Sequence, residues 1–218
     1  MDAEKKVSEK QLMKRRLRNI LIICAAVLLV LVVASLIIDR LSTNRKYEEA
    51  TKNLNYKFAE ADFDENIYDD PAYLELIENG FLYFCDTSNN QTIGYEREEA
   101  EKFGADVVFM TEYIYATIGG EYEKYNAMFS DLYYDDNAPL EKFTMQKIYD
   151  VTITRTSERD VTDKENTYRE YKYTVEYKIL DNNGTFRNDI ATGSRKQYFT
   201  VTDREGELKI DAIGVNLN

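Results

Sequence analysis

The sequence predicts an α+β protein with one N-terminal transmembrane helix, followed by helices packed on a curved antiparallel sheet of about four strands. Three observations predict this class. Ile20 to Ile38 is an uncharged apolar run, residues 96–118 repeat apolar side chains at helical spacing, and residues 171–179 alternate apolar with polar side chains. Alternation with a single apolar face is typical of a sheet that packs on one side only.

The apolar run has the length of a membrane span. At about 1.5 Å per residue, a helix from Ile20 to Ile38 reaches roughly 28 Å, close to the thickness of the bilayer hydrocarbon. A cleaved signal peptide is the alternative, although its apolar region is usually shorter, at about 7–15 residues. A basic cluster at residues 14–18 precedes the run, and such clusters tend to stay in the cytoplasm.

These features divide the chain into four parts. Residues 1–19 are predicted to be a basic cytoplasmic tail, 20–38 a transmembrane helix, 39–70 a juxtamembrane stalk or linker, and 71–218 an extracytoplasmic domain. The expected location is the cell membrane, with one span, and the lipid bilayer is the expected partner of Ile20 to Ile38.

Composition excludes several classes of function. The net charge of −12 opposes nucleic-acid binding, which relies on basic side chains that neutralise phosphates. The chain has no histidine, so a Ser–His–Asp triad is excluded and the commonest metal ligand is missing. We therefore expect no metal, no cofactor and no catalysis.

Cys85 lies in an apolar run, which indicates a buried thiol, with a disulfide between chains as the alternative.

Helical periodicity is clearest before Gly119. Apolar side chains recur there every three or four residues, which places them on one face of a helix from Glu96 to Ile118. The sequence Gly119-Gly120 ends this helix, and a second one is predicted from Glu121. Pro71 is predicted to begin a short helix that runs through Ile77.

Strand periodicity follows from residue 143 onward. Tyr149, Val151 and Ile153 alternate with polar residues, as do Gln197 and its neighbours, and a last strand is predicted over Leu208 to Val215. The strongest strand pattern places five residues on one face: Tyr171, Tyr173, Val175, Tyr177 and Ile179.

The region from Glu98 to Val215 resembles the NTF2-like (cystatin-like cone) superfamily. The resemblance lies in the turn Gly119 to Tyr125, in Met128-Phe129-Ser130-Asp131 and in the final hairpin over Asp203 to Ile210. It implies helices on a cone-shaped sheet. Behind one membrane anchor, the architecture is also similar to VirB8-like components of conjugation and type IV secretion machines, which are non-enzymatic scaffolds.

The resemblance implies a membrane-anchored binding or assembly domain whose partners are other membrane or envelope proteins, including a second copy of the chain. One alternative is a small-ligand or cell-wall sensor that uses the cone pocket, and another is a ketosteroid-isomerase-like enzyme. A pocket with an ionisable pair would favour the enzyme, and an open pocket without one would favour the sensor. A flat tyrosine-rich patch would favour the scaffold.

The apolar helix stripe is first of all a core face, but under a cone-shaped sheet it also has the position of a pocket wall. The residues expected to line such a ligand pocket are Phe103, Val107, Met110, Ile114, Tyr125, Phe129 and Tyr173.

Overall fold

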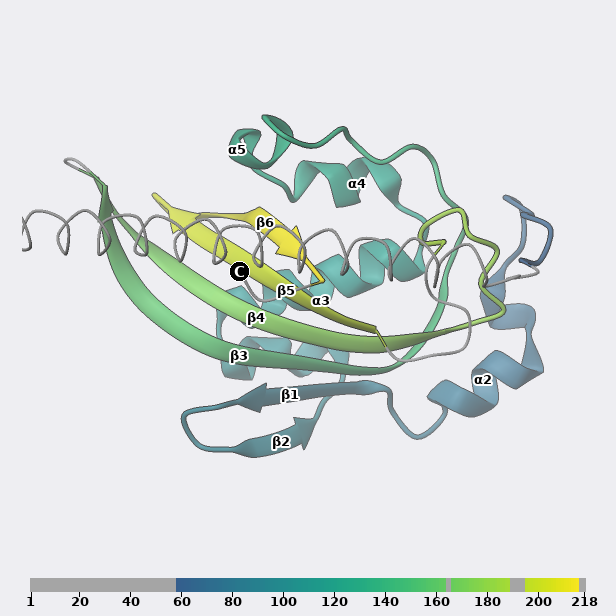
Figure 1. Cartoon of the computed structure of the whole chain (residues 1–218). Coiled ribbons are helices and arrows are strands. Elements are labelled where there is room, and N and C mark those ends of the chain that lie inside the picture. Colours follow the sequence, from purple (N-terminus) through teal and green to yellow (C-terminus); the bar gives the residue numbers. More distant parts are fainter. Residues whose placement is uncertain (1–57, 164–165, 189–194, 216–218) are drawn as a thin grey trace, which may run out of the picture. The chain divides into compact units, whose positions relative to one another are not determined.

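A six-stranded sheet is the frame of the computed structural model, which describes residues 58–163, 166–188 and 195–215 (Figure 1). The strand order is β2-β1-β3-β4-β5-β6. Neighbouring strands are antiparallel except β1 and β3, which are parallel. The strands are β1 (Leu82–Asp86), β2 (Gln91–Gly94), β3 (Lys147–Asp163), β4 (Asn166–Leu180), β5 (Arg195–Arg204) and β6 (Glu207–Gly214).

The protein is α+β, but the prediction of about four antiparallel strands was wrong, since the sheet has six strands and is mixed. The two extra strands form the hairpin of β1 and β2. All four residues of β2 are exposed, so β2 shows no alternation that a sequence pattern would reveal. Helices separate β1 from β3 along the chain, and a connection of this length allows parallel pairing.

The helices are short apart from α3, which lies along one side of the sheet (Figure 1). Asp70 caps α2 by accepting a hydrogen bond from the Ala72 N–H at 2.9 Å. With Pro71 as its first residue, α2 has the predicted bounds. The helices are η1 (Ile67–Asp69), α2 (Pro71–Ile77), η2 (Arg97–Phe103), α3 (Ala105–Ile118), α4 (Tyr122–Ala127) and α5 (Asp131–Tyr134).

The helix predicted over residues 96–118 is interrupted at Gly104. This glycine has φ +123°, and a Cβ at this position would lie 2.6 Å from Asp106 Oδ1. Only glycine fits such a backbone and such a close approach. The chain therefore forms the 3-10 helix η2 first and begins α3 anew at Ala105.

The core lies between α3 and the sheet. The inward face predicted for β4 is confirmed, because all five of its residues are buried, and Phe199 and Val201 of β5 are buried beside them. Near the start of β3, a bulge shifts the pattern. Asp150 has φ +52°, so Ile148 is buried where Tyr149 was expected.

The folded unit begins before residue 71. Tyr56–Asn218 form one compact unit, and Ile67, only 1% exposed, belongs to its core. The Lys147 ammonium, on β3, lies 2.8 Å from a Glu65 carboxylate oxygen and 2.9 Å from one of Asp70. Part of the segment 39–70, which was assigned to a stalk, is therefore integral to the domain.

The predicted single-pass membrane architecture and membrane location are not upheld. Among the residues that the structure describes, no helix is long and apolar enough to cross a bilayer. The tail at residues 1–19 and the apolar run from Ile20 to Ile38 lie outside the described residues.

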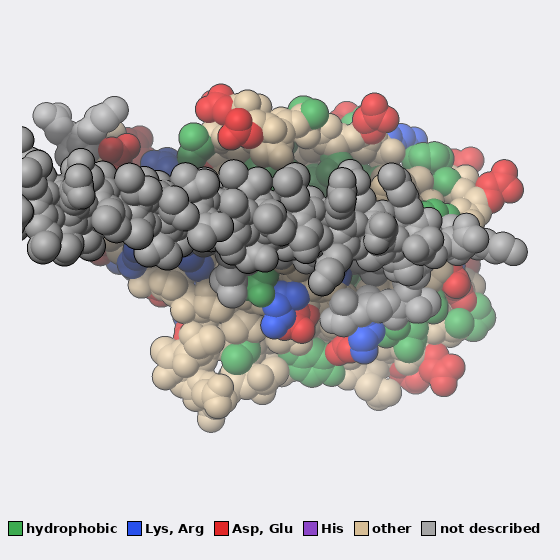
Figure 2. Space-filling model, viewed as in Figure 1, with side chains coloured by type: hydrophobic (Ala, Val, Ile, Leu, Met, Phe, Trp, Pro, Cys, Tyr) green, Lys and Arg blue, Asp and Glu red, His purple; other side chains and the backbone are tan. Residues whose placement is uncertain are grey.

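The hairpin of β3 and β4 extends beyond the other strands (Figure 1). β1 pairs with β3 only as far as Arg155, and β5 pairs with β4 only from Arg169 onward. Past these points the two strands form a ribbon held together across the strands by ion pairs, including Arg159 with Glu170 at 2.7 Å. On the face shown in Figure 2, acidic side chains occur in several separate places, some of them near α4 and α5.

Candidate ligand-binding site

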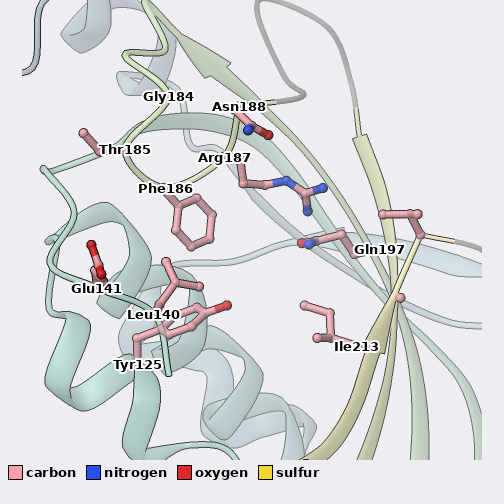
Figure 3. A pocket seen from close by; sticks show the side chains of 12 residues that line it. Tyr125, Leu140, Glu141, Gly184, Thr185, Phe186, Arg187, Asn188, Gln197 and Ile213 are labelled. Carbon is pink, nitrogen blue, oxygen red and sulfur yellow. The ribbon is translucent and has the colours of Figure 1, made fainter. Parts of the chain in front are cut away.

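A pocket of about 630 Å³ opens at one end of the sheet (Figure 3). It lies between the start of β5, the end of β6, the loop that follows β4, and the segment after α5. The described residues that line it are Tyr125, Leu140, Glu141, Gly184, Thr185, Phe186, Arg187, Asn188, Gln197, Ile213, Gly214 and Val215.

Local hydrogen bonds fix the loop that follows β4. The Gly184 N–H donates to Asn182 Oδ1 at 2.9 Å, and the Thr185 N–H donates to Asn183 Oδ1 at 3.0 Å. Asparagine side chains commonly form such turns with the backbone two residues further along. Thr185 also shares a 3.0 Å hydrogen bond with the hydroxyl of Thr144. The loop therefore holds Phe186 at the pocket without a ligand.

Aromatic rings form one wall. The Phe186 ring meets the Tyr125 ring edge to face, with centroids 5.6 Å apart, and both rings contact Phe143. Burial raises the pKa of Tyr125 well above its usual value, and the charge of Arg187 acts in the opposite direction. Burial therefore keeps the Tyr125 phenol neutral at neutral pH.

Gln197 stands out among the polar residues of the pocket. It occupies an inward position of β5, opposite Val175, and is only 4% exposed. Its Oε1 is buried and accepts no hydrogen bond from the described residues. Figure 3 shows its amide directed into the cavity, on the same side as Arg187 and opposite the apolar side chains of Phe186 and Leu140. Buried acceptors without a partner are rare in folded proteins.

The pocket in the structure is not lined by the residues that the sequence predicted. Of the seven predicted residues, only Tyr125 lines the pocket. Phe103 packs on Phe84 and Tyr95, with centroid distances of 4.9 Å and 5.4 Å. The other five are buried in the core: Val107, Met110, Ile114, Phe129 and Tyr173.

A buried carboxylate–tyrosine pair is present, but it lies outside the pocket. The Tyr173 hydroxyl donates to Asp106 Oδ2, and the Arg155 guanidinium donates to the same oxygen at 2.9 Å and to Asp86 at 2.6 Å. The hydrogen bonds from Arg155 lower the pKa of Asp86 to about 2. None of these residues lines the pocket, so the network ties α3 to β1, β3 and β4.

Four tyrosines of α3, α4 and α5 pack against the core: Tyr113, Tyr125, Tyr133 and Tyr134. Tyr113 and Tyr125 are buried. Tyr133 packs on Phe129 with centroids 4.3 Å apart, and the Tyr134 hydroxyl donates to the Asn126 carbonyl at 2.6 Å. These contacts hold α4 and α5 to the core.

One feature of the sequence indicates the pocket. Gln197 is a polar residue at an inward position of a predicted strand, followed there by Phe199 and Val201. A polar side chain at such a position requires a hydrogen-bond partner from the fold or from a ligand.

Comparison of the chain with protein-family models, with curated proteins and with solved structures finds no match. The function is therefore inferred from the geometry of the pocket.

Proposed function

We propose that residues 58–215 form a non-catalytic binding domain that holds a small, largely apolar molecule in the pocket beside Gln197. The observation that carries this proposal is the buried Gln197 Oε1, which has no partner among the described residues. An unpaired buried acceptor destabilises a fold by about 1–3 kcal/mol. In this orientation the oxygen is enclosed, but rotation of the amide exchanges Oε1 and Nε2. A ligand in the pocket that then donates a hydrogen bond to the oxygen removes that penalty.

The size and lining of the pocket support the same proposal. Pockets for small molecules usually measure about 300–1,000 Å³ and combine apolar walls with a few polar groups. Here the volume is about 630 Å³. Phe186, Leu140 and Ile213 supply apolar surface, whereas Gln197 and Arg187 supply polar groups on one side (Figure 3).

The distribution of acidic groups favours binding over isomerase-like catalysis. A catalytic carboxylate must lie within hydrogen-bond reach of the proton that it removes. Glu141 is the one carboxylate among the described lining residues, and it is exposed to water. The buried acid Asp106 is paired with Arg155, away from the pocket lining.

Protein assembly is a second candidate, favoured by the ribbon of β3 and β4. Beyond Arg155 and Arg169 its outer edges pair with no other described strand, and open edges are common sites for binding another chain. Replacement of residues 157–169 by a short turn tests this role. If assembly uses the ribbon, the mass measured by light scattering falls to that of a monomer; an unchanged mass contradicts it.

The binding function is tested with N-phenyl-1-naphthylamine, a neutral fluorescent probe that has one N–H donor. The full chain is titrated alongside Ile213→Trp, which places an indole ring in the pocket and narrows it. The control is Leu132→Trp, which places the same ring on α5 at a side chain that is 59% exposed.

We expect saturable binding by the wild type and by Leu132→Trp, and at least about tenfold weaker binding by Ile213→Trp. A tenfold change corresponds to about 1.4 kcal/mol. Absence of saturable binding by the wild type, or equal affinities of the two tryptophan variants, would refute the proposal.

A further inference from the structure

We propose that the pocket selects a neutral planar ring carrying an N–H group beside a C=O group, and that the carboxamide of Gln197 pairs with this edge. Cyclic amides (lactams) and the corresponding edges of free nucleobases present such groups. The inference rests on the proposed binding function and specifies the chemical class of the ligand.

The first step concerns the hydrogen-bonding groups of Gln197. A carboxamide presents an acceptor and a donor side by side in one plane. Oε1 is buried without a partner among the described residues, and Gln197 is one of the residues that line the pocket. A lactam edge offers the complementary pair of groups. Because donor and acceptor exchange places when the amide is rotated, the ring pairs with either orientation by turning over.

The second step concerns the shape of the walls. Phe186 and Tyr125 meet edge to face at 5.6 Å and leave aromatic surface along one side of the cavity, whereas Ile213 lies opposite (Figure 3). Aromatic side chains bind flat rings favourably, in offset-stacked or edge-to-face arrangements. A planar ligand fits between these walls while its polar edge faces Gln197.

The third step concerns charge. Arg187 is the one basic side chain among the described lining residues, and it already has an interaction within the chain. Glu141 lines the same pocket, and the whole chain carries a net charge of −12. An ionised carboxylate or phosphate has no N–H group to donate, so it would leave Gln197 Oε1 without a partner. A neutral edge meets none of these obstacles.

The test compares two ligands that differ by one methyl group. Full-length protein is titrated with 2-quinolone, a bicyclic lactam, and with 1-methyl-2-quinolone, which lacks the N–H donor. We expect the methylated compound to bind at least about tenfold more weakly, because sites built to receive a donor reject analogues that lack it.

Two variants test whether Gln197 causes the preference for 2-quinolone over 1-methyl-2-quinolone. Gln197→Met keeps the side-chain length but removes the carboxamide, so both quinolones are expected to bind with affinities within about threefold of each other. Gln91→Met makes the same change on the exposed strand β2 and is expected to keep the wild-type preference.

The outcomes separate the inference from the function on which it rests. Equal quinolone affinities in the wild type, together with saturable binding of N-phenyl-1-naphthylamine, overturn the lactam assignment and leave the binding function standing. A preference that persists in Gln197→Met overturns the role of this residue. Failure of both quinolones and of the naphthylamine probe overturns the binding function itself. Because the ligand comparison uses the wild type, it does not depend on whether a variant folds.

Discussion

The Gln197→Met substitution, measured without ligand, gives a direct test of the pocket. The change keeps the unbranched side chain and its approximate volume while it removes the unpartnered Oε1. In most buried glutamines such a change breaks hydrogen bonds and destabilises the fold. At Gln197 we expect the opposite, because the described residues supply no hydrogen bond to this oxygen.

The magnitude follows from two opposing contributions. Removal of a buried acceptor without a partner raises the free energy of unfolding by about 1–3 kcal/mol. This range applies to Gln197 because its side chain is buried, with 4% exposure. Imperfect packing of the new methionine opposes this by up to about 1.5 kcal/mol. The expected net result is a free energy of unfolding that rises by about 1 kcal/mol.

Urea denaturation of the full chain, followed by circular dichroism, measures this change. Gln146→Met is the matched control, since Gln146 is also buried but its amide donates to the Thr144 carbonyl at 2.7 Å. We expect this control to lower the free energy of unfolding by about 1–3 kcal/mol. Equal destabilisation by the two substitutions would show that Gln197 is already paired and would refute the reasoning.

Three further predictions concern the network and the buried tyrosines. Asp106→Asn weakens the bonds to Arg155 and Tyr173 and should lower the free energy of unfolding by about 2 kcal/mol or more, measured in urea; a change within experimental error would contradict a structural role. The pKa of Asp86 is lowered from 3.8 to about 2 by Arg155, so its contribution to stability is complete above pH 4 and is lost as the pH falls toward 2. Denaturation midpoints between pH 2 and 5 should therefore fall less steeply in Asp86→Asn, and parallel curves would contradict this. Burial raises the pKa of Tyr125 above its ordinary 10.0, so its contribution is complete below pH 10 and is lost at higher pH. The part of the tyrosinate absorbance that is missing in Tyr125→Phe should then rise together with the loss of circular dichroism in the wild type, whereas a rise of this part before unfolding would contradict burial.

Periodicity predicted those elements in which one face is buried and the backbone is regular. The inward residues of β4 follow a strict alternation and are all buried, and α2 has its predicted bounds because Asp70 and Pro71 mark its start. The pattern failed where the backbone departs from regular geometry. The positive φ values of Gly104 and Asp150 change which side chains face the core, but they cannot be recognised from the spacing of apolar residues in the sequence.

The pocket was not predictable from periodicity for a different reason. An apolar stripe shows that a face is buried, but it does not show whether side chains or empty space lie opposite. Met110 and Ile114 meet the filled core, whereas the cavity lies where a loop, two strand ends and the segment at Leu140 converge. Residues so far apart in sequence meet only through the tertiary fold.

The parallel contact between β1 and β3 has a consequence for how the chain acquires its structure. During synthesis, residues 82–94 leave the ribosome before β3, their partner strand, exists. An isolated two-stranded hairpin is marginally stable in water. The hairpin of β1 and β2 is therefore stable only after β1 has paired with Val151 and the following residues of β3. The waiting hairpin carries Leu82 and Phe84, which the mature core encloses. Until β3 is synthesised, these exposed apolar residues can therefore bind chaperones or aggregate.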